Sequence, residues 1–210
     1  MVQGLAVSAE GGAFATLARL LATDGTAAHP HAARLTAPRS QTRDLVDAIH
    51  ALCSVHGQQP HLLSVAVAAA GDTTAREWLA AAGTSFAADR AALAQLVANA
   101  GPLPSTPGQA ESAAALASER HSLELLARSE RNGVANGAAA ALIADWVAVR
   151  TVMVTAADRF GTTLSLPSLP DPAALLATAP ERAAAFGMQQ LLAQHRGLWS
   201  LLEARSSARG

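Results

Sequence analysis

The sequence predicts an all-α protein, a bundle of four to six helices around one central apolar helix, in an up-and-down or a ferritin-like arrangement. Half of the 210 residues are hydrophobic, and much of that half is alanine, the strongest helix former. Residues that favour strands are scarce, since Tyr is absent and Ile occurs only at positions 49 and 143. Apolar residues also recur three and four positions apart along most segments, which is the spacing of one helix face.

The composition excludes several classes of function. A formal net charge of -1 and a pI near 6.6 argue against nucleic-acid binding through a broad basic surface. All 15 basic residues are Arg, which excludes a Lys Schiff base, and the single cysteine, Cys53, excludes an internal disulfide. No uninterrupted apolar run reaches the roughly 18 residues of a membrane span, and the N-terminus lacks the basic start of a signal peptide. We therefore expect a soluble, cytoplasmic protein without a membrane span.

The N-terminal part is predicted to be an extension of the main domain. We expect residues 1–40 to form a helix and a loop, and residues 41–210 to form the bundle. Phe14, Leu17 and Leu21 indicate a helix over about residues 10–22. The Gly, Pro and Thr content of residues 23–40 is typical of a loop, and the "HPH" stretch at 29–31 is expected on the surface.

Three helices are predicted in the next sixty residues. Residues 42–56 carry an apolar stripe that ends in His56, and Gly57 follows as a stop signal. A short apolar segment over residues 60–71 favours a helix but is also compatible with a strand. Asp72 is expected to cap a long helix that reaches about Asn99.

A Pro-rich boundary, "AGPLPSTPGQAE", separates these helices from the second half of the chain. Thr106 is predicted as the N-cap and Pro107 as the first residue of a helix that continues to about Arg131. The "RNGVANG" segment is expected to be a turn between helices or a kink within one. Residues 134–160 are apolar on nearly every side, which indicates the central helix of the bundle.

The last helix is predicted over about residues 181–204, after a second Pro-rich linker. It should dock on the bundle or on a second subunit, and we expect a homo-oligomer formed through it. The stripe that supports this consists of Ala184, Met188, Leu191, His195, Leu198 and Leu202.

Four charged residues lie at or beside core-facing positions of two helices. They are Asp89 and Arg90 in the long helix, and Asp145 and Arg150 in the central one. A buried charge is costly unless it is paired, so we expect ion pairs between helices. The expected pairs are Arg90 with Asp145 and Asp89 with Arg150, or either Arg with Glu124.

A metal centre inside the bundle is the main alternative to these ion pairs. Nitrogen and oxygen ligands could hold iron, manganese or zinc, as in ferritin-like proteins, although the chain has "HSLE" once and in the reverse order of the ferritin-like motif. This alternative requires carboxylates that are free of Arg. The expected ligands are His56, Asp89, His121, Glu124 and Asp145.

A third hypothesis assigns the arginines to a ligand. Arg90 or Arg150 could clamp the carboxylate or phosphate of a small molecule, provided that the Arg lies in a pocket without an acidic partner. The sequence contains no complete catalytic constellation, so its enzymatic status stays open. The leading hypothesis is a non-enzymatic binding or assembly module without a cofactor.

Four segments, "GPLPSTPGQAES", "RHSLELLA", "GAAAALIADW" and "GMQQLLAQHRGLW", resemble a small bacterial family of helical proteins of unknown function. The resemblance covers most of the chain from about residue 42 onward. It implies an all-helical domain with a Pro-rich linker, and it brings no activity or site residue.

Overall fold

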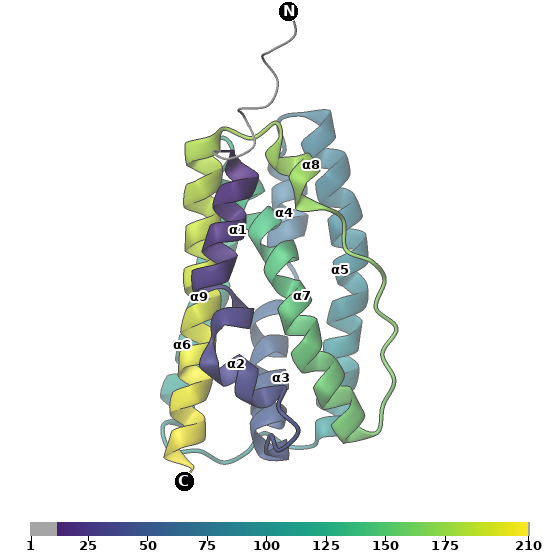
Figure 1. Cartoon of the computed structure of the whole chain (residues 1–210), viewed down its shortest axis with the longest axis vertical. Coiled ribbons are helices and arrows are strands. Elements are labelled where there is room, and N and C mark those ends of the chain that lie inside the picture. The colour runs from purple at the N-terminus through teal and green to yellow at the C-terminus, as the bar shows by residue number, and fades with distance from the viewer. Residues whose placement is uncertain (1–11, 210) are drawn as a thin grey trace, which may run out of the picture.

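The computed structural model describes residues 12–209, and in this range the chain forms nine α-helices, one 3-10 turn (η1) and no strand (Figure 1). The all-α prediction is therefore confirmed. The elements are α1 Ala13–Asp24, η1 Thr26–Ala28, α2 Pro30–Leu35, α3 Thr42–His56, α4 Leu62–Ala69, α5 Thr73–Ala100, α6 Gln109–Ala127, α7 Val134–Phe160, α8 Pro172–Leu176 and α9 Glu181–Ala208.

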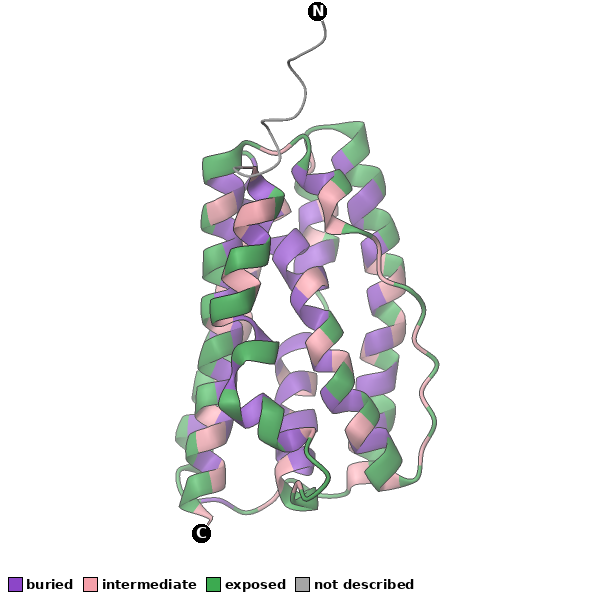
Figure 2. Cartoon of the chain, in the orientation of Figure 1, coloured by how far each residue is buried: buried purple, intermediate pink, exposed green. Residues whose placement is uncertain are grey.

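The helix α7 is the centre of the bundle, as its apolar sequence predicts. It contacts every other α-helix, most extensively α9, and buried positions cover most of its length (Figure 2). Within the described chain it is also the one helix long and apolar enough to cross a membrane. However, 67% of its most apolar window is buried inside the bundle, as in the core helix of a soluble protein.

Small residues allow α7 and α9 to cross with their backbones in direct contact. A Cβ atom added at Gly137 would lie 2.0 Å from the carbonyl oxygen of Ala184, and one at Gly187 would lie 2.0 Å from that of Val134. Both distances are far below van der Waals contact, so only glycine fits at these two positions. This crossing fixes α9 against the core.

Several predicted helix boundaries are confirmed. Residues 42–56 form α3 and are followed by Gly57, and α7 spans the predicted residues 134–160. The side chain of Asp72 caps α5 by accepting a hydrogen bond of 2.8 Å from the backbone N–H of Ala75. The segment 60–71, for which a helix and a strand were both compatible, is helical, since its residues Leu62–Ala69 form α4.

Other local predictions were wrong. Residues 23–40 are not a simple loop, since they form η1 and α2, and the expected surface histidines His29 and His31 are buried. Thr106 does not cap α6, which begins after Gly108 and receives no side-chain cap. The second Pro-rich linker, residues 161–172, has no helix before its last residue, but a short helix that was not predicted, α8, begins there with Asp171 as its N-cap. Both α2 and α8 begin with a proline after a capping residue, His29 or Asp171, but a helix of five or six residues is too short to show an apolar stripe.

The N-terminal segment packs against the bundle. The helix α1 lies along α9 and also contacts α7, and η1 contacts α7 and α9 (Figure 1). The predicted start of the first helix at residue 10 lies outside the described residues.

The apolar stripe of α9 is used inside the chain. All six stripe residues are buried, and α9 packs on α7, α1 and α6. Docking on the bundle, the first of the two predicted options, is therefore what the structure shows. The homo-oligomer stays a prediction, and this stripe is not available to support it.

Candidate functional site

One predicted ion pair joins α5 to α7. Asp89, which is fully buried, accepts hydrogen bonds from Nε and Nη2 of Arg150 at 2.8 and 2.6 Å. The indole N–H of Trp146 donates a third bond of 3.0 Å to the same carboxylate. Asp89 is thus fully satisfied, and the predicted pair of Asp89 with Arg150 is confirmed.

The second predicted ion pair, Arg90 with Asp145, is wrong. Asp145 accepts bonds of 2.7 and 2.6 Å from the backbone N–H and the hydroxyl of Thr26, and a bond of 2.7 Å from Nδ1 of His195. Trp199 in turn donates its indole N–H to the Thr26 hydroxyl at 2.8 Å. Burial alone would raise the pKa of Asp145, but the hydrogen bonds from His195 and Thr26 outweigh it and hold the pKa below its usual value.

A cluster of aromatic rings surrounds His195, the residue whose ring contacts Asp145. The His56 ring stands edge-on to the rings of His195 and Trp146, with centroid distances of 5.0 and 4.9 Å. The His61 ring lies 5.8 Å from His56 and stacks on Phe86 at 4.5 Å. These rings come from α3, α5, α7 and α9 and from the residue before α4, so the cluster lies where most of the bundle meets. We call His56, His61 and His195, together with Glu119, the histidine core.

The histidine core contains polar atoms without partners. Both ring nitrogens of His56, Nε2 of His61 and of His195, and Oε1 of Glu119 are buried and make no hydrogen bond with any residue from 12 to 209. Each unsatisfied buried group costs about 1–3 kcal/mol. His61 accepts a hydrogen bond at Nδ1 from the backbone N–H of Leu63, so its unpartnered Nε2 is the protonated nitrogen.

The electrostatics of the histidine core follow from burial. Burial and the neighbouring rings of His195 and His61 lower the pKa of His56 well below 6.5. Burial, helped by the charge of Arg90, lowers the pKa of His61 to about 3. Burial raises the pKa of Glu119 to about 7, against an opposing effect of His195. His56 and His61 are therefore neutral imidazoles, and the carboxyl group of Glu119 gains its charge near neutral pH.

The structure does not assemble the predicted metal ligands. Asp89 is occupied by Arg150, and Asp145 by Thr26 and His195. His121 lies exposed on α6, and Glu124 on the same helix is half-buried. Across residues 12–209, no three His, Cys, Asp or Glu side chains are placed to hold a metal ion. Of the five predicted ligands, only His56 belongs to the histidine core.

The predicted ligand-binding arginines have different surroundings. Arg150 is engaged by Asp89 and by the carbonyl oxygen of Pro167, at 2.7 Å, and is therefore not available to clamp a ligand. Arg90 is half-buried, and within the described chain it has no ion pair and lines neither the cavity between α3, α6 and α9 nor the one at the N-terminus of α3. Burial lowers its pKa.

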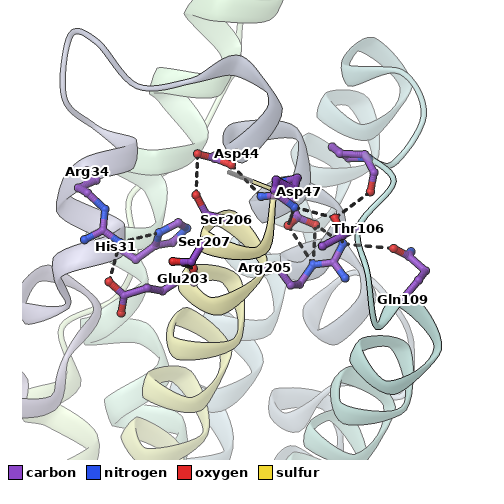
Figure 3. A network of polar contacts seen from close by, with 12 residues as sticks. His31, Arg34, Asp44, Asp47, Thr106, Gln109, Glu203, Arg205, Ser206 and Ser207 are labelled. Atoms are coloured by element: carbon purple, nitrogen blue, oxygen red, sulfur yellow. Dashed lines mark hydrogen bonds and ion pairs between the residues drawn. The ribbon is translucent and has the colours of Figure 1, made fainter.

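A second polar network lies at the C-terminal end of α9 (Figure 3). Arg205 holds Asp47 with three contacts of 2.9–3.1 Å, and both side chains are buried. Arg209 bridges two carboxylates of α3, contacting Asp47 at 2.6 Å and Asp44 at 2.7 Å. We call these four residues the arginine lattice. Its two positive and two negative charges compensate each other.

Neutral side chains complete the arginine lattice. The Thr106 hydroxyl accepts a 2.9 Å bond from Arg209, Gln109 accepts a longer one of 3.4 Å from Arg205, and Ser206 donates to Asp44 at 3.0 Å. Figure 3 shows Thr106 and Gln109 beside the facing side chains of Asp47 and Arg205. The lattice therefore joins α3, α9 and the segment that enters α6.

A cavity of about 220 Å³ opens between α3, α6 and α9, directly beside the lattice. One part of its wall is apolar and the other is polar. The lining consists of Asp47, His50, Ala51, Ser54, Leu103, Gln109, Ser112, Ala113, Leu116, Leu201, Leu202 and Arg205.

The polar groups that remain free in this cavity are neutral. Asp47 and Arg205 neutralise each other, and Ser112 already donates to the carbonyl oxygen of Gly108. His50 uses Nε2 to contact the carbonyl oxygen of Gly101 at 2.9 Å, which leaves Nδ1 as an acceptor. The Ser54 hydroxyl makes no hydrogen bond with other described residues. The cavity therefore offers hydrogen-bond donors and acceptors without net charge.

Sequence reasoning missed the arginine lattice and most of the histidine core. Arg205 and Arg209 lie in a polar C-terminal stretch that looks solvent-exposed, and His61 lies at the start of the short apolar segment 60–71, where nothing marks it as buried. The only available signal for His195 was its position on the apolar stripe of the last helix. Nothing in the sequence indicates that Thr26 caps a carboxylate of the central helix.

The comparisons with known proteins give a family and no function. No curated protein and no solved structure matches the chain. The model of one family, described as a family of unknown function (DUF6975), matches residues 21–210. This match extends the predicted resemblance toward the N-terminus and includes the helices that carry the histidine core and the lattice. The chain belongs to the family of unknown function DUF6975.

Proposed function

We propose that the protein is a non-enzymatic binding module whose ligand is a small, neutral, partly apolar molecule. The observation that carries this proposal is the cavity between α3, α6 and α9. Small-molecule sites are typically concave and mostly apolar, with a few polar groups that orient the ligand. This cavity combines both features.

The charge of the site supports a neutral ligand. The ion pair of Asp47 and Arg205 leaves no uncompensated charge on the wall, and a charged ligand would lose its hydration without gaining a counter-ion. A neutral ligand instead meets the Ser54 hydroxyl and Nδ1 of His50 on α3. Leu116 and Leu202 offer apolar contact on the facing helices.

The geometry supports binding rather than catalysis. Ser54 and His50 both line the cavity and lie one helical turn apart, yet no hydrogen bond joins the hydroxyl to the ring. An activated serine requires such a contact with its base. Asp47 is held by two arginines and is not available as a general base.

The helix α6 provides a route of entry. It buries only four of its residues, Ser112, Glu119, Leu123 and Ala127. The glycines that precede α6 and α7, Gly108 and Gly133, have φ angles of 73° and 94°, which other residues rarely adopt. Because α6 buries fewer residues than α7 or α9, we expect it to separate from the bundle more easily than they do.

A fragment screen with a matched pair of variants tests this function. A library of neutral fragments is titrated into isotope-labelled protein, and amide shifts are followed by NMR. We expect shifts around Ser54, Ser112 and Leu202 in the wild type. Ser54→Phe fills the cavity and should abolish them, whereas Ser118→Phe places the same ring on the exposed face of α6 and should keep them. Shifts that persist unchanged in folded Ser54→Phe would contradict the proposal.

A further inference from the structure

A second cavity, of about 350 Å³, lies at the N-terminus of α3 on the other side of the arginine lattice. Asp44 lines this cavity, whereas Asp47 lines the first one, and Arg209 contacts both carboxylates. Figure 3 shows Asp44 and Ser206 near His31. The lining consists of His31, Arg34, Leu35, Ala37, Arg39, Ser40, Gln41, Asp44 and Ser206.

The acidic groups around the second cavity are already neutralised. Arg34 pairs with Glu203 at 2.6 Å, and Asp44 pairs with Arg209 and accepts a bond from Ser206. By contrast, Arg39 on the wall makes no ion pair with another described residue. Arg159, which adjoins this wall, donates only to the carbonyl oxygen of Ser40 and the hydroxyl of Thr42 among residues 12–209. The surroundings of the cavity therefore carry an excess of positive charge.

Two residues that line the same cavity, His31 and Ser40, have hydrogen-bond donors without acceptors in the described chain. Arg34 approaches Nδ1 of the buried His31 at 3.2 Å, which makes Nδ1 the acceptor and leaves Nε2–H as a donor. That Nε2–H makes no hydrogen bond to other described residues. The Ser40 hydroxyl is shielded from solvent and also has no partner in the described part of the chain. An anion in this cavity could accept hydrogen bonds from both groups, in addition to its attraction to the arginines.

The start of α3 adds to the attraction for an anion. Gln41 precedes this 15-residue helix and makes no side-chain capping bond. The first N–H groups of a helix carry partial positive charge, and an anion placed there is stabilised. The N-terminus of α3, Arg39 and the donors of His31 and Ser40 would thus all stabilise an anion in this cavity.

We propose that this cavity binds a small oxyanion, a phosphate group or a carboxylate. The anion lies between Arg39 and the N-terminus of α3 and accepts hydrogen bonds from His31 and Ser40. A phosphate group suits this arrangement better than a carboxylate, because it has more acceptor oxygens and a higher charge. This site is separate from the proposed neutral-ligand site.

The test is an NMR titration of the full chain at constant ionic strength. Inorganic phosphate, acetate and chloride are added in turn, and the amide signals from residue 40 to residue 44 and the His31 ring are followed. Phosphate is expected to shift these signals with saturation below about 20 mM, which corresponds to weak but specific binding. Acetate should shift the same signals more weakly, and chloride should not shift them.

Two arginine variants decide the outcome. Arg39→Ala removes a side chain that is exposed and unpaired, so the fold should be kept while phosphate binding weakens about fivefold or more. Arg131→Ala removes an exposed arginine between α6 and α7, far along the bundle, and should leave binding unchanged. Absence of saturation in the wild type, or equal losses in the two variants, would overturn the proposal.

Discussion

The arginine lattice and the histidine core solve the problem of buried polar groups in opposite ways. In the lattice, Asp47 meets two guanidinium groups and all four charges are compensated. In the histidine core, His56 is fully buried and neither of its ring nitrogens has a partner among the residues that the structure describes. Both regions link helices that are distant in the sequence, and α3 and α9 contribute to each.

The difference teaches which polar groups hold the fold together. Removing one partner of a compensated buried pair leaves an isolated charge and costs more than the pair contributed. A buried imidazole without a hydrogen-bond partner destabilises the folded state, because it has lost its hydration. Replacing it with an apolar side chain removes this cost. The lattice is thus a structural element, and it forms the polar end of the proposed ligand cavity.

The largest expected effect comes from breaking the lattice. Asp47→Ala leaves Arg205 and Arg209 buried beside a cavity, and we expect the free energy of unfolding to fall by about 3–5 kcal/mol. Urea denaturation followed by circular dichroism measures this change. The control is Asp24→Ala, which breaks the exposed pair with Arg196 and should cost at most about 1 kcal/mol. Similar losses in the two variants would remove the distinction between compensated and exposed pairs.

The next effect is a pH dependence that originates in the histidine core. The pKa of His56 and of His61 is lower in the folded protein than the ordinary 6.5, so the folded state takes up fewer protons in acid. Their contribution to stability is present above pH 6.5 and is lost as the pH falls toward the folded pKa, about 3 for His61. Denaturation midpoints of the variant Glu119→Gln, which lacks the opposing effect of Glu119, should therefore decrease steadily from pH 6.5 to pH 4. A flat profile of this variant would contradict the neutral state of His56 and His61.

The effect of Glu119 on the pH dependence of stability should be opposite to that of His56 and His61. Its folded pKa of about 7 exceeds the ordinary 4.5, so its contribution is present below pH 4.5 and is lost as the pH rises through 7. Glu119→Gln removes this loss, and the variant should gain stability over the wild type progressively between pH 4.5 and 7. Since one pKa unit corresponds to about 1.4 kcal/mol, the gain should reach about 1–3 kcal/mol and stay constant at higher pH. A gain that does not depend on pH would argue against ionisation of Glu119.

The smallest effect is expected from replacing a histidine by leucine at two positions of α3, His56 and His50. His56→Leu replaces an unpartnered imidazole, and we expect the free energy of unfolding to increase by about 1–2 kcal/mol. His50→Leu removes the bond to the carbonyl oxygen of Gly101 and should decrease it by about 1 kcal/mol. Both changes are measured by denaturation at pH 7. A clear loss of stability in His56→Leu would mean that the ring has a partner in solution, such as a bound water or a ligand.

The all-α fold could be predicted from the sequence because its long helices are specified by short-range sequence signals. The apolar stripe from residue 42 to residue 56, the cap at Asp72 and the apolar segment 134–160 each act over a few neighbouring residues. Short elements such as α2 show only a capping residue and a proline at the first position, because six residues cannot show a helical period. Their helicity depends on packing against α9 and α7.

The candidate sites were predictable only in part. Asp89 and Arg150 could be matched because both lie on core-facing positions of long helices. Asp145 faced the core as predicted, but its partner Thr26 lies 119 residues away in a segment that reads as a loop. Asp47 and Arg205 are separated by 158 residues. Periodicity shows which side chain is buried, and only the packing of the whole chain shows which one it meets.

The proposed binding function is tested most directly by the affinity of one ligand for two proteins. The strongest fragment from the screen is titrated calorimetrically into the wild type and into Ser54→Phe, after circular dichroism has shown that both are folded. Our account predicts saturable one-to-one binding to the wild type and an affinity at least about tenfold lower for the filled cavity, a difference of about 1.4 kcal/mol. Equal affinities would place the ligand elsewhere and contradict the assignment of the cavity between α3, α6 and α9.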